Sequence, residues 1–407
     1  MQSTQKVPAP TYDGPIFDGD AHVHEGDGFA LFQKYLPRKY HADWLLENKF
    51  GPDGQYGTFL GGKRLEKMES NAEGLVPPPG KLKDWLREVK TGKPMLSSWI
   101  KPTPDMYDRD ARVRKLDEFG VESSLMFPGS FIGTIAFFEK DIEAGNAVFH
   151  AYNEYLHDQW GFNHQDRIYS VGILNLMDLE SSIKEAEWMI KRGLKIAVMP
   201  LGPAGGRAPA DPYFDPLWAR LNEAGVVLSF HVSEASFMHP LVHAFGEQPL
   251  QPRRTGQTAW QWLNTYGEVP LMMTLSSFIY LNFFERFPNM KICSVENGAG
   301  WVPRFLKKMD QMRGMAKNGF WPCGQLKERP SMIFKRNVYV VAYPEDEVKE
   351  IVDDIGTDLC ILCGSDYPHA EGVPTPKDFV AEALGGLDAG QIRNIMYDNG
   401  RRMIPRA

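Results

Sequence analysis

The feature that most constrains the fold is a strand-then-helix pattern that repeats along most of the chain. Short apolar runs such as KIAVMPL and VVLSFH are each followed by a segment with apolar residues at helical spacing. In residues 108–120, for example, Val113, Leu116 and Phe119 recur at this spacing, and Gly120 is expected to end the helix. We count eight such strands, from the one that opens at Ile16 to the one in LCILCGSD. Strands that alternate with helices pair in parallel, which predicts an α/β fold.

Eight strand–helix units favour a closed (β/α)8 TIM barrel over an open sheet. An open doubly wound sheet typically carries a glycine-rich turn after its first strand, and here that strand runs into DGDAHVHE instead. With 407 residues, 43% of them hydrophobic and 24% charged, the chain resembles an ordinary folded protein that can bury a large core. We therefore predict a single barrel domain over residues 1–407.

One segment interrupts the pattern, because residues 41–104 follow the first strand before its helix arrives. Within it, WLLENKFGPDGQYGTFLGGKRL is predicted to form a hairpin with turns at the glycines, and VPPPGK to form an irregular turn. Insertions between a strand and its helix lie on the face of a barrel where active sites are built. We expect residues 41–104 to be either a lid over the active site or an oligomer contact.

Composition excludes several classes of partner. The formal net charge is −7 and basic residues are scattered, so no surface for nucleic acid is indicated. No apolar run approaches the roughly 20 residues that span a bilayer, and MQSTQKVPAP lacks the apolar region of a signal peptide. Four cysteines are too few for a disulfide framework. We expect a cytoplasmic homo-oligomer that acts on a small molecule.

The predicted strand ends carry an unusual set of polar side chains. Because the carboxyl ends of barrel strands converge, such residues meet at one mouth even when they are far apart in sequence. Imidazole and carboxylate together suit one divalent metal ion, with zinc as the first choice and manganese as the alternative. The residues are Asp20, His22 and His24 after the first strand, His231 after the fifth, Glu296 after the sixth and Asp366 after the eighth.

Four motifs in this chain, FDGDAHVHE, FHVSE, ERFPNMKICSVENGAGW and GSDYPHAEG, resemble those of a known family. It is the amidohydrolase-related family that includes α-amino-β-carboxymuconate-semialdehyde decarboxylase, γ-resorcylate decarboxylase and 5-carboxyvanillate decarboxylase. The resemblance covers most of the chain outside residues 41–104. It implies that His231 and Asp366 are metal ligands and that Asp366 also acts in proton transfer.

The first motif allows two sets of ligands. Family members carry either His-x-His or an acidic residue-x-His, usually with an apolar residue directly after the second ligand. Val23 follows His22, which favours Asp20 with His22 as the ligand pair. The alternative pair, His22 with His24, would place Glu25 directly after the second ligand.

Three further residues are candidates for binding or catalysis. The related decarboxylases have a histidine at the position of Glu296, and a carboxyl group there can still move a proton if burial raises its pKa. His369, three residues after Asp366, is a candidate for holding a substrate carboxylate or for supporting a ligand. Arg207 is a candidate anion clamp, since a guanidinium group pairs with carboxylates through two hydrogen bonds.

These observations predict a metal-dependent hydrolase or lyase. The resemblance implies that its substrate is a small carboxylic acid, aromatic or derived from ring cleavage, that undergoes carbon–carbon cleavage or decarboxylation. The alternative reaction is hydrolysis of an ester, lactone or amide by a metal-activated water molecule. A hypothesis from another class is an idle barrel that serves as a binding or scaffold protein, although the chain retains every candidate ligand.

Overall fold

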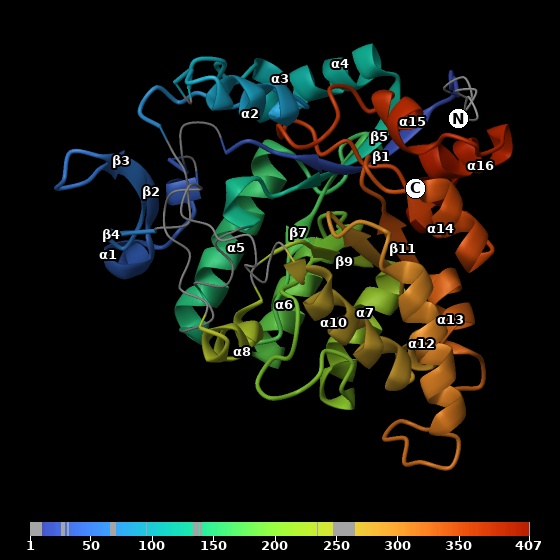
Figure 1. Cartoon of the computed structure of the whole chain (residues 1–407). Helices are drawn as coiled ribbons and strands as arrows, with labels where there is room; N and C mark the ends of the chain where they lie inside the picture. The colour runs from blue at the N-terminus through green and yellow to red at the C-terminus, as the bar shows by residue number, and fades with distance from the viewer. Residues whose placement is uncertain are drawn as a thin grey trace.

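The computed structural model describes residues 10–25, 29–30, 32–65, 71–94, 96–132, 138, 141–233, 235–246 and 265–406. Within these residues, parallel strands lie among surrounding helices (Figure 1), and backbone hydrogen bonds close the strands into the predicted TIM barrel. One run of strands is β1–β5–β6 and the other is β7–β8–β9–β10–β11–β12. The strands are β1 (Ile16–His22), β5 (Val121–Phe127), β6 (Ile168–Ser170), β7 (Gly172–Ile173), β8 (Ile196–Val198), β9 (Val227–His231), β10 (Ile292–Val295), β11 (Val338–Val341) and β12 (Ile361–Leu362).

Two backbone hydrogen bonds join these runs into one barrel. The N–H of Val171 donates to the carbonyl oxygen of Met126 at 2.9 Å, so β6 and β7 act as one strand interrupted at Val171. The N–H of Gly19 donates to the carbonyl oxygen of Cys363 at 3.0 Å, which brings β12 against β1. A parallel barrel of this kind directs the carboxyl ends of its strands to one face.

Aspartates and glycines set the limits of several outer helices. Asp108, Asp141 and Asp178 precede α4, α5 and α6, and each accepts a backbone N–H of the first helical turn at 2.7–3.0 Å. Gly120 follows α4 with φ 69°, as the sequence predicts. The outer helices are α4 (Arg109–Phe119), α5 (Ile142–Gln159), α6 (Leu179–Ile190), α7 (Asp215–Ala224), α8 (His239–Ala244), α10 (Glu268–Tyr280), α11 (Phe283–Arg286), α12 (Val302–Met315), α13 (Pro330–Asn337), α14 (Val348–Ile355), α15 (Asp378–Ala383), α16 (Ala389–Arg393) and α17 (Asn399–Met403).

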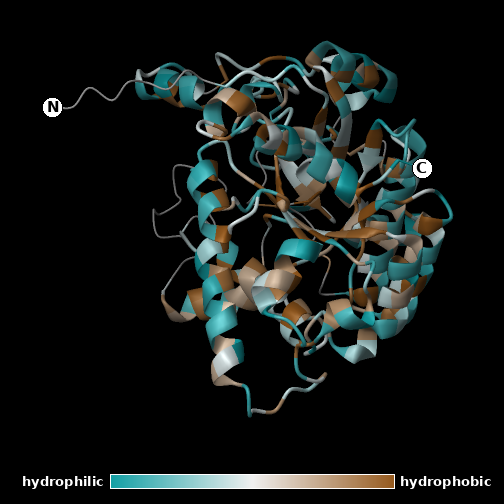
Figure 2. Ribbon diagram, turned by 90° about the vertical axis from the view of Figure 1, so that its right-hand side faces the viewer, coloured by the Kyte–Doolittle hydropathy of each residue, from teal (hydrophilic) through white to brown (hydrophobic). Residues whose placement is uncertain are grey.

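Hydropathy follows this arrangement of strands and helices. Figure 2 shows hydrophobic residues on the central strands and hydrophilic residues on the outward faces of the helices. The barrel strands are buried along nearly their whole length, as expected for a parallel sheet covered by helices. None of the described helices combines the length and the apolar character that crossing a membrane requires.

The insertion, residues 41–104, contains the predicted hairpin. Strands β2 (Leu46–Phe50) and β3 (Tyr56–Leu60) pair antiparallel and β4 (Lys63–Arg64) follows, which confirms that prediction. Helix α2 (Leu82–Lys90) was not predicted, because it is short and buries only Trp85. The short α1 (His41–Trp44) begins the insertion, and α3 (Pro104–Tyr107) begins at its last residue. Residues 66–70 and 95 lie outside the described part of the chain.

Candidate metal centre

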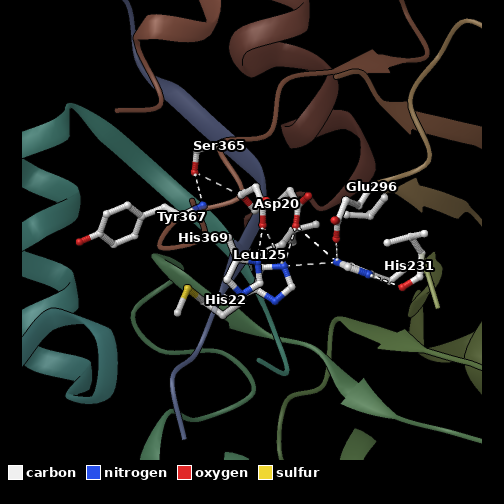
Figure 3. A network of polar contacts seen from close by, with 12 residues as sticks. Asp20, His22, Leu125, His231, Glu296, Ser365, Tyr367 and His369 are labelled. Atoms are coloured by element: carbon white, nitrogen blue, oxygen red, sulfur yellow. Dashed lines mark hydrogen bonds and ion pairs between the residues drawn. The ribbon is translucent and has the colours of Figure 1, made fainter. Parts of the chain in front are cut away.

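Polar side chains from the ends of the barrel strands meet in one cluster. Asp20 and His22 lie at the end of β1, His231 ends β9, and Glu296 follows β10. One potential ligand atom from each of these four lies within 4.8 Å of the others. Asp366 extends the cluster, because its Oδ1 atom lies 3.4 Å from the Nε2 atom of His22. Figure 3 shows labelled cluster side chains pointing toward one another.

The two imidazole rings face each other through nitrogen atoms that carry no proton. The Nδ1 atoms of His22 and His231 lie 2.9 and 3.0 Å from the carbonyl oxygens of Pro128 and Val232. A carbonyl oxygen only accepts, so each Nδ1 carries the hydrogen and each Nε2 presents a lone pair. These Nε2 atoms are 3.3 Å apart. Burial lowers the pKa of His22 to about 3 and that of His231 to about 4, so both rings are neutral.

A buried carboxylate oxygen completes this arrangement. The Oδ1 atom of Asp20 lies 3.4 Å from Nε2 of His22 and 3.8 Å from Nε2 of His231, and it has no hydrogen-bond partner among the described residues. Burial raises the pKa of Asp20 to about 6. Two nitrogen lone pairs and an unpaired oxygen repel one another unless a cation lies between them. The donor set therefore fits a divalent metal ion.

Asp366 and His369 form an ion pair at the edge of the cluster. Nδ1 of His369 lies 2.7 Å from Oδ1 of Asp366, and the ring of His369 stacks on His22 with 4.1 Å between centroids. Burial lowers the pKa of His369, but the Asp366 carboxylate raises it more, to about 9. Burial also raises the pKa of Asp366. His369 is therefore positively charged at neutral pH.

Glu296 lies close enough to the cluster either to carry a proton beside it or to share its cation. Its Oε2 atom is 3.1 Å from Nε2 of His231, and burial followed by repulsion from Asp366 and Asp20 raises the pKa of Glu296 well above its usual range. Two acceptors at this distance require either a proton on the carboxyl group or a shared cation. Glu296 and Asp366 both adopt left-handed backbone, with φ of 53° and 55°. Such strain costs roughly 1–3 kcal/mol per residue and is typical of functional sites.

The structure places the other two candidates elsewhere. His24 belongs to none of the potential ligand groups among the described residues, and its backbone N–H donates to the carbonyl oxygen of Met106 at 2.8 Å. Arg207 has a side chain that is 49% exposed, lies 3.8 Å from Asp211 and stacks over the ring of Tyr213. The structure thus brings Asp20 rather than His24 into the cluster, and Arg207 not at all.

A cavity of about 510 Å³ lies beside the cluster. Residues of the barrel and of the insertion both line it. Residues 71–77 of the insertion form a continuous part of the lining. Other lining side chains include His24, Met106, His369 and Glu371 from the barrel loops and Asn48, Tyr56 and Trp99 from the insertion.

Comparisons with known proteins identify the family. The amidohydrolase family model matches residues 108–406. The chain belongs to the amidohydrolase family. A crystal structure of an amidohydrolase from Mycobacterium avium subsp. paratuberculosis K-10 matches with 27% identity and a TM-score of 0.83, covering 98% of this chain and 99% of its own. A search of curated proteins found no match.

Two decarboxylases share the fold of this amidohydrolase at lower identity. The 5-carboxyvanillate decarboxylase from Sphingomonas paucimobilis is 19% identical with a TM-score of 0.53, covering 72% of this chain and 82% of its own. That from Novosphingobium aromaticivorans DSM 12444, complexed with manganese and 4-hydroxy-3-methoxy-5-nitrobenzoic acid, is 18% identical with a TM-score of 0.55, covering 84% and 99%. In the present chain, the match to the family model begins at residue 108. The insertion, residues 41–104, therefore lies outside the matched region.

Two buried carboxylates near the cluster were not predicted from the sequence. Asp18 accepts hydrogen bonds from the N–H and the hydroxyl of Ser365 at 2.9 and 2.5 Å, which ties β1 to the loop after β12. Glu25 accepts from the N–H groups of residues 130–131 and from the hydroxyl of Tyr152. The spacing of Asp18 two residues before Asp20, on the same face of β1, was the available signal.

Proposed function

We propose that this amidohydrolase is a metal-dependent enzyme that cleaves a carbon–carbon bond in, or decarboxylates, a small carboxylic acid that is aromatic or derived from ring cleavage. The observation that carries the proposal is the pair of imidazole lone pairs 3.3 Å apart beside the unpaired oxygen of Asp20. The structural similarity to a decarboxylase complexed with manganese and a benzoic acid supports this class of substrate.

The proposed ligands are Asp20, His22, His231 and Asp366. Two imidazoles with two carboxylates make zinc our first choice, and manganese is the alternative. When bound, such an ion supplies a Lewis acid that polarises a carboxylate or carbonyl oxygen of the substrate. The remaining chemistry belongs to side chains around the ligands.

In the decarboxylation that we propose, His369 and Glu296 have separate tasks. The positively charged ring of His369 borders the cavity and attracts the substrate carboxylate. The raised pKa of Glu296 favours its protonated form, and in this proposal Glu296 gives its proton to the ring carbon as carbon dioxide leaves. A proton from water then restores the acid. Arg207, far from this cluster, takes no part in the proposed reaction.

Hydrolysis of an ester, lactone or amide is the second candidate. The observation that favours it is the carboxylate of Asp366, whose raised pKa makes it a stronger base toward water. In this reaction Asp366 takes a proton from the attacking water and later returns it to the leaving group. His369, at 2.7 Å, orients the carboxylate of Asp366.

The experiment measures metal content and both reactions together. We expect about one divalent ion per chain by elemental analysis, with turnover lost on chelation and restored by zinc or manganese. A panel of hydroxybenzoic acids tests for carbon dioxide release, and a panel of aryl esters and lactones tests for hydrolysis. Full turnover by a protein with little metal, unchanged by added zinc or manganese, would overturn the proposal.

We also propose that residues 41–104 act as a lid that closes the cavity. Asn48, Tyr56 and Trp99 line it, and two backbone hydrogen bonds fasten the insertion to the loop after β12. These bonds run from Gly80 N–H to His369 O at 3.0 Å and from Leu82 N–H to Ala370 O at 2.9 Å. Shortening the β2–β3 hairpin should reduce the turnover rate more than it reduces the stability of the folded protein. Unchanged kinetics with an altered oligomer size would favour the alternative, an oligomer contact.

A further inference from the structure

A closed ring of hydrogen bonds lies directly behind the proposed metal ligands. His22 N–H donates to the carbonyl oxygen of Tyr367 at 2.7 Å, and the hydroxyl of Tyr367 donates to Oδ2 of Asp105 at 2.6 Å. Arg112 Nε donates to the carbonyl oxygen of Asp105 at 2.6 Å, and its Nη2 donates to that of His22 at 3.0 Å. The ring thus joins β1, the loop after β12, α3 and α4.

Every member of the ring is buried. Arg112 is 1% exposed and His22 is fully buried, while Asp105 and Tyr367 are 6% and 7% exposed. The guanidinium group of Arg112 also lies 5.0 Å from the centre of the Tyr367 ring. A buried charge destabilises the fold unless its hydrogen bonds are satisfied. Replacing one member of the ring therefore leaves a buried group of its neighbour without that partner, which costs stability. The four residues are therefore expected to behave as one unit.

The ring also fixes the backbone that carries two proposed ligands. His22 is itself a ligand, bound at its N–H and at its carbonyl oxygen by two different members. Tyr367 directly follows Asp366, whose own N–H donates to the carbonyl oxygen of Asp20 at 2.7 Å. The ends of β1 and β12 are thus held together at the point where three ligands leave the backbone.

We propose that Arg112, Asp105 and Tyr367 are positioning residues that set the distance between the ligands His22 and Asp366. This inference rests on the proposed metal centre. The ring holds the backbone at the ends of β1 and β12, and it thereby keeps Nε2 of His22 3.4 Å from Oδ1 of Asp366.

The test compares two tyrosine-to-phenylalanine variants. Tyr367→Phe removes the hydroxyl that binds Asp105. Tyr169→Phe removes a hydroxyl in β6 that accepts from Arg401 at 2.8 Å, and Tyr169 belongs neither to the ring nor to the potential ligand groups. Metal is stripped from each protein, zinc or manganese affinity is measured against a competing chelator, and the Tm of the metal-free form is recorded. We expect Tyr367→Phe to weaken binding roughly 10- to 100-fold and Tyr169→Phe to leave it unchanged.

A second pair covers the case in which Tyr367→Phe does not fold. Asp105→Asn keeps an oxygen that accepts from the Tyr367 hydroxyl, whereas Asp105→Ala removes it. We therefore expect Asp105→Asn to bind metal more tightly than Asp105→Ala does. Wild-type affinity in folded Tyr367→Phe, or in both Asp105 variants, overturns the inference. Affinity that falls in proportion to Tm in the Tyr367 and Tyr169 variants alike also overturns it. A wild-type protein that binds neither metal refutes the metal centre itself, which is a distinguishable result.

Discussion

The strand ends of the barrel and the insertion differ in how firmly their side chains are held. Asp20, His22 and His231 are at most 3% exposed, and parallel strands flank β1 and β9 in the barrel wall. The β2–β3 hairpin forms a small sheet with the two-residue β4, separate from the barrel strands, and its Phe50 is 63% exposed, so the hairpin is less enclosed than the strand ends. A rigid region therefore carries the candidate chemistry, and a less supported region forms one wall of the cavity.

This difference separates two kinds of effect. Changes at the strand ends should alter metal content or the chemical step, because those atoms must keep a fixed geometry. Changes in the insertion should alter substrate binding while metal content stays the same, because its described residues border the cavity and lie outside the ligand groups.

The largest effect is expected from replacing a ligand on β1. We predict that Asp20→Ala lowers metal affinity by more than the roughly 10- to 100-fold that loss of an outer partner costs, and that turnover falls with it. His24→Ala, four residues further along the chain, is the matched control. It should retain metal because His24 lies outside the cluster. Elemental analysis after dialysis measures both. The reverse result would establish His22 with His24 as the ligand pair.

Glu296→Gln should have the next largest effect. The amide keeps the shape and removes the proton, so kcat should fall roughly 10²- to 10⁴-fold with metal content unchanged. Glu180→Gln serves as the control, because Glu180 is an exposed carboxylate on α6 that belongs neither to the potential ligand groups nor to the cavity lining. Loss of metal in Glu296→Gln would make Glu296 a ligand, in line with its 3.1 Å distance from His231. Wild-type kcat would leave it a structural role only.

The structural elements that the sequence predicts are those whose apolar residues recur at a regular spacing. Apolar runs and glycine stops indicate the barrel strands and most helices, because burial on both sides of a parallel sheet requires such runs. The barrel geometry then implies that residues at strand ends meet. Asp20, His22, His231, Glu296 and Asp366 do lie together, although what each of them does stays a prediction.

The features that the sequence did not predict depend on contacts between distant segments. Arg112 lies in a helix pattern where a charge suggests exposure, yet it is buried because Asp105 and the carbonyl oxygen of His22 bind it. Conversely, Arg207 is only a candidate anion clamp from its residue type and its loop, and the structure places its side chain beside Asp211 and Tyr213 instead. Helix α13 was missed because it runs into β11 without a loop.

A pair of glycines in the insertion tests how it is fastened to the barrel. Gly80 and Gly54 both have positive φ, but only at Gly80 would a Cβ atom meet backbone, that of Pro374. We predict that Gly80→Ala displaces the cavity wall and raises KM, so that kcat/KM falls by up to the roughly 10²-fold that a 1 Å misplacement costs. Gly54→Ala, which meets nothing within 4 Å, should strain the turn and leave KM unchanged. Equal KM values in the two variants would remove the support for a lid.

The smallest effect is expected at Asp178, which caps α6 on the outside of the barrel. Hydrogen bonds from the side chain and the backbone N–H of Ser181 hold the pKa of Asp178 below its usual value of 3.8. Its stabilising contribution is therefore present above that value and is lost as the pH falls through the lower pKa of the folded state. Asp178→Ala should reduce the free energy of unfolding by about 1 kcal/mol at neutral pH, with metal content and KM unchanged. Asp178→Asn is the matched control, because asparagine caps a helix as well as aspartate does but does not titrate in this range. Denaturant unfolding at pH 7 and pH 3 measures both variants, and the wild type should lose more stability on acidification than Asp178→Asn. A changed metal content in Asp178→Ala would contradict the prediction, because it would show that the stability of an outer helix affects the metal centre.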